Sequence, residues 1–242
     1  MNPILLIPAR LASTRLPAKP LADIGGVPMI VRVLRQAEAA GLGPVAVAAG
    51  DAEIAAAVKA ADGQAVLTDP DLPSGSDRIH AALEKLDPQR RHDVVINLQG
   101  DLPALDPAQI RAVAMALEDS GADIATLAAQ ITDPSERDNP SVVKAVVAWD
   151  KDGMRGRALY FTRATAPTGD GPLFHHVGIY AYRRDALTRF VGLPPSPLEM
   201  REKLEQLRAL EANMSIAVAR VDSAPLSVDT PSDLERARKI LS

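Results

Sequence analysis

The chain contains no cysteine, which excludes disulfide bonds, thiolate metal ligands and a cysteine nucleophile. Aromatic residues make up only 3% of the 242 residues, whereas hydrophobic residues reach 47% and are mostly aliphatic, so we expect a globular fold. No uninterrupted apolar run approaches the roughly 18 residues that a membrane span requires. The first apolar run, Ile4–Ile7, has no basic lead-in and stops at Pro8, which is unlike a signal peptide. These absences indicate a cytoplasmic protein that does not contact the membrane.

Several common sequence motifs are also missing. The net charge of −4 argues against a general nucleic-acid binder, so no nucleic-acid partner is expected. The dinucleotide fingerprint GxGxxG and the Walker P-loop are absent, and so are HExxH and the Cys/His spacings typical of zinc sites. Any phosphate or metal site must therefore be built from other residues.

The first 130 residues alternate short apolar runs with longer helical stretches. The predicted strands are Ile4–Ile7, Val45–Ala49, Ala65–Thr68, Val94–Leu98 and Ile124–Ala128. The predicted helices are Met29–Ala40, Ala52–Ala61, Gly75–Leu86 and Ala108–Ser120. Asp51 and Asp106 are suited to cap two of these helices, with Pro107 at a first helical position. This alternation predicts an α/β fold with a doubly wound, mostly parallel sheet.

The rhythm changes after residue 130, where turn-rich segments separate the elements. We predict strands at Val142–Trp149, Val177–Tyr182 and Ser215–Val221, and helices at Leu198–Leu210 and Pro231–Leu241. Thr165–Pro172 is expected to be a loop. Because no repeat and no low-complexity linker appears, a smaller subdomain inserted on the main sheet is the favoured interpretation.

The loop after the first strand, PARLASTRLPAKP, holds three cations, Arg10, Arg15 and Lys19, and the first acid to follow them is Asp23. Open α/β sheets bind ligands outside the carboxyl ends of their strands. Small residues let backbone N–H groups approach a phosphate, and Arg and Lys supply the charge. A solvated surface loop would show the same residues, so both interpretations stay open on spacing alone.

Two aspartates follow apolar runs in positions where a metal ligand is plausible. Asp101 ends the stretch NLQGD, in which the Gln99 amide can read a ligand hydroxyl or a base edge. Asp229 follows an apolar run in PLSVDTPSDLE. Carboxylate oxygens suit Mg²⁺, a hard cation. Alternatively, Asp101 closes an Asx turn and Asp229 only shapes the start of a helix.

Three further stretches have both a structural and a functional interpretation. LPSGSDR, with Ser74 and Arg78, opens a helix whose N–H groups can meet an anion or can simply be capped. Arg163 in YFTRA can clamp a carboxylate, while His176 and Tyr180 in HHVGIYAY share a strand face or pack in the core. The segment after residue 193 has a charged helix face, on which we expect a Glu199–Lys203 pair. Its leucine stripe serves either the core or a dimer contact.

These stretches occur together, and in this order, in one known family. The blocks IPARLASTRLPAKPLADIGGVPMI, SGSDR, NLQGD, NPSVVK, YFTRA, HHVGIYAYR, PSPLE, LEQLR and VDTPSDLE resemble those of the 3-deoxy-manno-octulosonate cytidylyltransferases, also called CMP-KDO synthetases, over essentially the whole chain. The resemblance implies a nucleotide-diphospho-sugar transferase-like fold with an inserted sugar-binding and dimerisation subdomain. It also implies transfer of CMP from CTP to the sugar acid KDO, with release of pyrophosphate, a Mg²⁺ cofactor and a homodimer.

The resemblance also assigns roles to individual residues. It implies one nucleotidyltransferase domain in which residues 1–130 mainly bind CTP, residues 131–222 mainly bind the sugar and form the dimer, and residues 223–242 carry the metal-ligand loop and the closing helix. The implied catalytic residues are Arg10, Lys19, Asp101 and Asp229, the two aspartates being the metal ligands. The implied nucleotide-binding residues are Pro8, Ala9, Arg10, Arg15, Lys19, Ser74, Gly75, Ser76, Arg78 and Gln99. The implied sugar-binding residues are Gln99, Arg163, His176, Tyr180, Glu199, Glu205 and Gln206.

The chain departs from the family pattern at a few positions. Leu102 stands where the family usually has an acid after the QGD aspartate, and if that acid assists the metal site, the site here has one charge fewer. SGSDR replaces SGTER, and the loop Thr165–Pro172 is shorter than in many members. Two alternatives remain: a cytidylyltransferase for a related acid of the sialic or 8-amino-KDO type, and an inactive nucleotide-binding or assembly protein that kept the fold.

Overall fold

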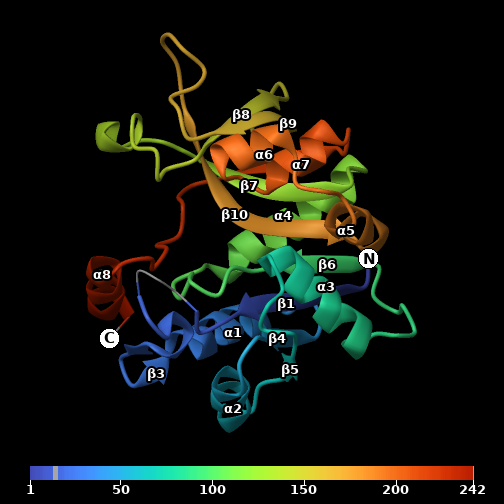
Figure 1. The fold of residues 1–242 in the computed structure, drawn as a ribbon. Coiled ribbons are helices and arrows are strands. Elements are labelled where there is room, and N and C mark those ends of the chain that lie inside the picture. Colours follow the sequence, from blue (N-terminus) through green and yellow to red (C-terminus); the bar gives the residue numbers. More distant parts are fainter. Residues whose placement is uncertain (13–15, 242) are drawn as a thin grey trace. The chain divides into compact units, whose positions relative to one another are not determined.

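The structure is a computed structural model that describes residues 1–12 and 16–241 (Figure 1). It consists of two compact units, residues 1–111 together with 225–242, and residues 112–224. The sequence analysis instead divided one domain at residues 130 and 222 according to what each part binds, and that division stays a prediction. None of the helices in the described part of the chain is long and apolar enough to cross a membrane.

The first unit is built on a four-stranded parallel sheet in the order β5 (Ala65–Leu67), β4 (Val45–Ala49), β1 (Pro3–Ala9) and β6 (Val94–Asn97). The connecting helices are α1 (Met29–Ala39), α2 (Ala52–Ala60) and α3 (Gly75–Leu86). The chain moves outward from β1 through β4 to β5 and then returns to β6. Right-handed crossovers therefore place α1 and α2 on one face and α3 on the other, which confirms the doubly wound parallel sheet for this unit.

Burial explains why the strands of this sheet read as continuous apolar runs. Leu5, Leu6 and Ile7 in β1 and every residue of β4 are buried, as expected for parallel strands that helices cover on both faces. A short hairpin of β2 (Asp23–Ile24) and β3 (Val27–Pro28), which the sequence did not predict, follows the 3-10 turn η1 (Lys19–Leu21).

The end of the chain returns to the first unit. Helix α8 (Pro231–Leu241) and the segment before it pack against the hairpin and the start of α1 in a core formed by Ile24, Met29, Val228, Leu234 and Ala237. This core fixes the loop that precedes α8 beside the loop that follows β6, because the Val228 N–H donates to the Asp101 carbonyl at 3.0 Å. Residues more than a hundred positions apart are thereby brought together.

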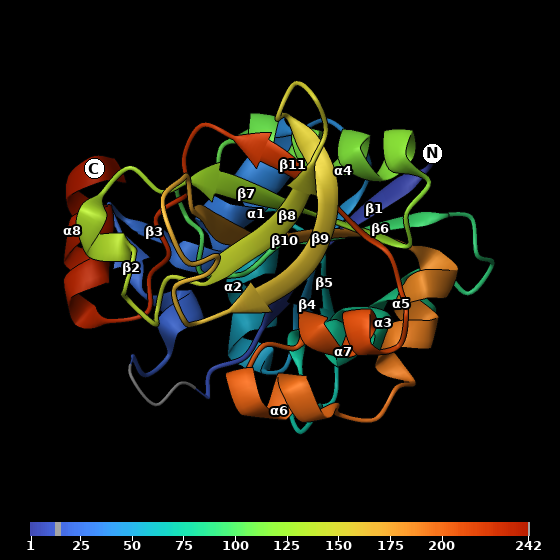
Figure 2. The same cartoon turned by 90° about the horizontal axis from the view of Figure 1, so that it is seen from above.

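The second unit has a mixed sheet in the order β10 (Phe174–Arg183), β7 (Ile124–Gln130), β11 (Ile216–Val221), β9 (Arg155–Thr162) and β8 (Lys144–Trp149). Only β7 and β11 pair in parallel. Strand β8 also pairs with β10 at His175 and Lys144, so the sheet curls back on itself. Figure 2 shows β8 and β9 as long curved strands side by side. The remaining elements are α4 (Pro107–Ser120), which crosses the unit boundary, η2 (Pro134–Glu136) and α5 (Arg184–Val191).

The single helix expected at Leu198–Leu210 is wrong. The structure has two short helices, α6 (Pro197–Glu202) and α7 (Gln206–Glu211), separated at Lys203, whose φ of 57° is left-handed. The carbonyls of Glu202 and Lys203 accept hydrogen bonds from the Arg163 guanidinium at 2.8 and 3.3 Å. The helix therefore ends where a distant arginine, rather than the next turn, binds its last carbonyl groups.

Candidate functional site

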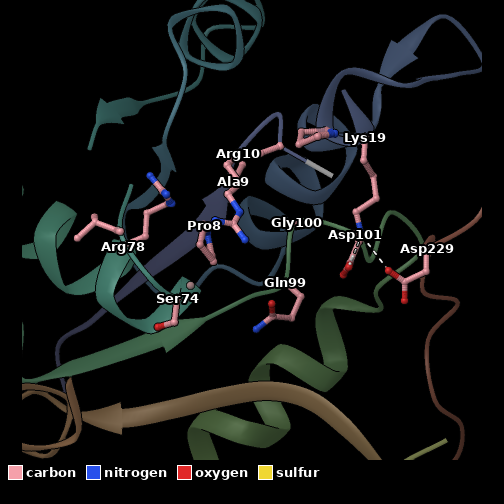
Figure 3. A pocket seen from close by; sticks show the side chains of 14 residues that line it. Pro8, Ala9, Arg10, Lys19, Ser74, Arg78, Gln99, Gly100, Asp101 and Asp229 are labelled. Carbon is pink, nitrogen blue, oxygen red and sulfur yellow. Dashed lines mark hydrogen bonds and ion pairs between the residues drawn. The ribbon is translucent and has the colours of Figure 1, made fainter. Parts of the chain in front are cut away.

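A cavity of about 440 Å³ opens in the first unit at the carboxyl ends of β1 and β6 (Figure 3). The strand order reverses at β1, which has β4 on one side and β6 on the other, so the loops after β1 and β6 leave space between them. The cavity is lined by Pro8, Ala9, Arg10, Ala12, Lys19, Pro20, Leu72, Ser74, Gly75, Arg78, Gln99, Gly100, Asp101 and Asp229. Most of the nucleotide-binding residues expected from the sequence thus line one cavity.

The loop that carries Arg10 is held by the neighbouring strand. The Gly50 N–H, directly after β4, donates to the Ala9 carbonyl at 2.8 Å, and the Leu11 N–H donates to Asp51 Oδ2 at 2.7 Å. Asp51 precedes α2, as predicted, but its side chain makes no capping hydrogen bond with that helix. It fixes the Arg10 loop instead, a role that the sequence analysis missed.

Arg78 lines the cavity and also supports its wall. Its guanidinium is almost fully buried and donates to Thr68 Oγ1 at 2.6 Å, to the Asp69 carbonyl at 2.9 Å and to the Pro70 carbonyl at 3.1 Å. Burial lowers the pKa of Arg78, and the nearby charge of Arg10 lowers it further. Arg78 therefore holds the loop after β5 while its charge remains close to that of Arg10.

Glycines allow the backbone loops to approach one another around the cavity. A Cβ at Gly50 would lie 2.8 Å from Arg78 Nη1, and a Cβ at Gly100 would lie 3.0 Å from the Pro8 carbonyl oxygen. Gly50 was not predicted to matter, although a glycine at the carboxyl end of a predicted central strand is a signal that could have found it. A side chain at either position would force its neighbours to shift.

The start of α3 combines the structural and the functional interpretations of LPSGSDR. Ser74 is the N-cap, since its Oγ accepts from the Asp77 N–H at 3.1 Å, and it also lines the cavity. Gly75 lines the cavity too, and a Cβ at this position would lie in tight contact with Pro8 Cγ, at 3.3 Å. Ser76 is buried and is not among the lining residues.

The two aspartates expected to bind a metal are brought together by Lys19. Lys19 Nζ lies 2.8 Å from Asp101 Oδ2 and 3.1 Å from Asp229 Oδ1, as the dashed lines of Figure 3 show. Burial alone would lower the pKa of Lys19, but the attraction and hydrogen bonds of Asp101 and Asp229 outweigh it, so the pKa is raised. The side chain is therefore a firmly protonated cation between two carboxylates.

The position of Asp229 is set by the start of α8. Asp233 Oδ2 accepts from the N–H groups of Asp229 and Thr230 at 3.2 and 2.9 Å, and from Thr230 Oγ1 at 2.7 Å. Although burial raises the pKa of Asp233, these hydrogen bonds lower it overall. With Val228 fully buried just before it, Asp229 has little freedom to leave the cavity.

The loop after β6 contributes two of the residues that were expected in the site. Gln99 and Asp101 line the cavity, whereas the side chain of Leu102, at the position where the family usually has an acid, is buried and offers no oxygen. Arg15 lies outside the described residues. Among residues 1–12 and 16–241, no group of three or more His, Cys, Asp or Glu side chains is placed to hold a metal.

The residues expected to bind a sugar lie in the second unit, apart from Gln99. The Arg163 guanidinium donates to three carbonyls, those of Glu202, Pro140 and Lys203, at 2.8, 3.0 and 3.3 Å. A guanidinium has five N–H donors, so two of them are not used in these bonds. The Glu202 carboxylate in turn accepts from Thr162 Oγ1 at 2.8 Å and from the Arg163 N–H at 2.9 Å.

His176 and Tyr180 lie beside each other on β10, with ring centroids 5.6 Å apart. His176 is buried against Phe161, and its Nε2 lies 3.0 Å from Thr126 Oγ1. Burial, with a contribution from His175, lowers the pKa of His176 to about 3, so the ring is neutral at pH 7. Burial, Tyr182 and Glu205 raise the pKa of Tyr180, which keeps its hydroxyl protonated.

The acids of α6 and α7 have different environments. Glu199 accepts both Nε and Nη2 of Arg208, at 2.8 and 2.6 Å, and completes a capping box with Ser196. Arg208 is thus the partner of Glu199, where the sequence led us to expect Lys203. Gln206 is buried, and Glu205 is close enough to Tyr180 to act on its pKa.

Comparison with known proteins identifies the family. A family model described as Cytidylyltransferase matches residues 4–216. A 3-deoxy-manno-octulosonate cytidylyltransferase from Parvibaculum lavamentivorans is 65% identical over 241 residues, covering 100% of this chain and 93% of that protein. The chain belongs to the 3-deoxy-manno-octulosonate cytidylyltransferase family. A relative of the same name from Methylobacterium radiotolerans is 65% identical over 240 residues, covering 99% of this chain and 97% of that protein.

Solved structures agree with this family membership. A structure of CMP:2-keto-3-deoxy-manno-octonic acid synthetase complexed with CTP has a TM-score of 0.90 at 38% identity, covering 99% of this chain and 98% of that chain. A nucleotidyl transferase from Methanothermobacter has a TM-score of 0.62 at 17% identity and shares the fold, over 99% of this chain and 97% of that chain. The resemblance drawn from the sequence blocks is confirmed, and so is the nucleotidyltransferase-like α/β fold.

Proposed function

We propose that this chain transfers CMP from CTP to 3-deoxy-D-manno-octulosonate (KDO), giving CMP-KDO and pyrophosphate for lipopolysaccharide core synthesis. The observation that carries the proposal is the cavity of the first unit, where Arg10, Lys19 and two aspartates gather at the carboxyl ends of β1 and β6. The names of relatives at 65% identity and the CTP complex of a similar structure support the choice of nucleotide and acceptor.

The cavity of the first unit is the proposed CTP site. A triphosphate carries about four negative charges, and the Arg10 guanidinium and the Lys19 ammonium supply positive charge against them. Ser74 and Gly75 line the cavity at the start of α3, where helix N–H groups would face the nucleotide. Gly100 lets the loop after β6 come close to the Pro8 carbonyl, so that its backbone would also lie near the nucleotide. Arg15 stays a predicted helper of the triphosphate.

Asp101 and Asp229 are the proposed Mg²⁺ ligands. Their oxygens already converge on one cation, the Lys19 ammonium, which shows that two carboxylates can share a positive charge there. Both donors are hard oxygens, and Mg²⁺ commonly takes one or two carboxylates, with water and substrate phosphates completing its shell. Cytidylyltransferases of this kind generally use a divalent metal. When bound, Mg²⁺ would neutralise phosphate charge and favour ionisation of the attacking hydroxyl.

The second unit is the proposed sugar-binding part. The two Arg163 N–H groups not used for the three carbonyls are suited to the KDO carboxylate. His176, Tyr180, Glu205 and Gln206 stay predicted contacts for sugar hydroxyls, and so does Gln99 of the first unit. Glu199 is the least supported of them, because Arg208 and the Ser196 N–H already occupy its carboxylate.

The reaction needs no covalent enzyme intermediate. The anomeric hydroxyl of the sugar would attack the α-phosphorus of CTP, and pyrophosphate would leave. A homodimer through residues 194–210 also belongs to the proposal, although the buried Leu204 and Leu207 serve the core of their own unit. A cytoplasmic location stays a prediction.

The test is a pyrophosphate-release assay with CTP, Mg²⁺ and a panel of sugar acids. We expect release with KDO and none without an acceptor. Release with a sialic acid or 8-amino-KDO, but not with KDO, would replace the acceptor and keep the chemistry. Asp101→Asn is expected to abolish turnover with an unchanged circular dichroism spectrum, and full turnover in this variant would contradict the metal role.

A further inference from the structure

Lys19 occupies the place where the proposed metal ligands converge. Its Nζ is within 3.1 Å of one oxygen from each aspartate, and its side chain is only 17% exposed. The two carboxylates belong to loops more than a hundred residues apart, after β6 and before α8. Without a cation between them, two like charges held this close would repel each other. The ammonium therefore stabilises the pair in the arrangement that a metal would need.

The same contacts oppose the metal. A divalent cation bound between Asp101 Oδ2 and Asp229 Oδ1 would lie against the ammonium, and the two positive charges would repel each other there. The buried Leu102 offers no further carboxylate that could hold the metal beside the lysine. A metal that takes these two oxygens therefore displaces the Lys19 ammonium from them.

The backbone of Lys19 is fixed, so the movement would be confined to its side chain. The Lys19 N–H donates to the Leu16 carbonyl at 3.2 Å, the Ala22 N–H donates to the Lys19 carbonyl at 3.1 Å, and Pro20 is buried. The released ammonium therefore remains within the cavity that Arg10 also lines. There the triphosphate of the proposed nucleotide is the natural new partner for it.

We propose that Lys19 is an exchangeable internal counter-ion, which holds Asp101 and Asp229 together before the metal arrives and moves to the nucleotide phosphates when the metal replaces it. Metal alone then binds weakly, because it must displace the ammonium. Metal and CTP together bind tightly, because the CTP phosphates become the new partner of the ammonium that the metal displaces. The inference rests on the metal and nucleotide roles given under the proposed function.

The experiment measures Mn²⁺ binding to the full chain without nucleotide, using the electron paramagnetic resonance signal of free Mn²⁺. Lys19→Gln is expected to bind Mn²⁺ about tenfold more tightly than the unchanged protein. This factor is about the lower end of what a charge-assisted hydrogen bond contributes, because the pair is partly exposed. Lys19→Arg keeps a cation and should stay within about threefold of the unchanged protein. Lys19→Met serves as a second neutral variant if Lys19→Gln fails to fold.

Two controls separate exchange from a general change in charge. Lys59→Gln removes an exposed lysine of α2 and should leave the affinity unchanged. Arg10→Gln removes a cation of the same cavity that lies outside the aspartate pair and should tighten binding less than Lys19→Gln does. Equal effects of Arg10→Gln and Lys19→Gln, or unchanged or weaker Mn²⁺ binding in both neutral Lys19 variants, would overturn the counter-ion role.

Asp101→Asn distinguishes this failure from a failure of the proposed metal site. If Asp101→Asn weakens Mn²⁺ binding but the neutral Lys19 variants do not tighten it, the aspartates bind metal and only the exchange is wrong. If no variant and not even the unchanged protein binds Mn²⁺ saturably, with or without CTP, the metal site itself is wrong and the exchange falls with it.

Discussion

Replacing Gly50 by alanine tests whether close packing behind the cavity positions its two arginines. The added Cβ would lie 2.8 Å from Arg78 Nη1, 3.1 Å from Arg78 Cζ and 3.3 Å from Arg10 Cβ. The Arg78 guanidinium cannot simply swing away, because it is buried and donates to Thr68 Oγ1 and to the Asp69 and Pro70 carbonyls. Overpacking of this kind costs about 1–3 kcal/mol of unfolding free energy.

Urea unfolding and steady-state kinetics measure the two consequences of Gly50→Ala. We expect the loss of about 1–3 kcal/mol in unfolding free energy, and a several-fold rise in KM for CTP because Arg10 and Arg78 are displaced. Gly192→Ala is the matched control, since its Cβ would meet only ordinary contacts at 3.5 Å. If Gly50→Ala behaves like Gly192→Ala in both assays, the reasoning about the cavity wall is refuted.

Two other predictions concern side chains whose roles the structure revealed. Asp51→Ala removes the acceptor of the Leu11 N–H and should raise KM for CTP about tenfold. Asp51→Asn keeps an acceptor, so its KM for CTP should stay close to that of the unchanged protein. Equal effects of both variants on KM would contradict the positioning role. His176 has its pKa lowered from 6.5 to about 3, so protonation favours the unfolded chain, and the stability that the buried neutral ring contributes is lost as pH falls from 6.5 toward 3. Chemical denaturation between pH 4 and pH 7 should show this slope, and His176→Phe should reduce it; an equal slope in both proteins would count against the buried neutral ring.

Local sequence pattern was sufficient for the elements that are buried on both sides. The apolar runs of β1, β4 and β6 and the helical spacing of α1, α2 and α3 were predicted to within a few residues. Such elements satisfy their own backbone hydrogen bonds or those of a similar neighbour, so composition and period determine them. Strand β9 was missed because Arg155, Gly156 and Arg157 at its start lack the apolar pattern of a strand. Its strand conformation is stabilised by pairing with β8 and β11.

The sequence alone predicted most of the loops that line the cavity. It placed Arg10, Gln99 and Asp101 after buried strands and Ser74 at a helix start, and a parallel sheet brings such ends to one edge. The partners of these side chains became evident only in the folded structure. Lys19 pairs with both aspartates, Asp51 holds the Arg10 loop instead of capping α2, and Arg163 ends α6 by binding its carbonyls. These partners are tens to hundreds of residues apart, and charge pairing and hydrogen bonding depend on distance in space, which only the folded chain sets.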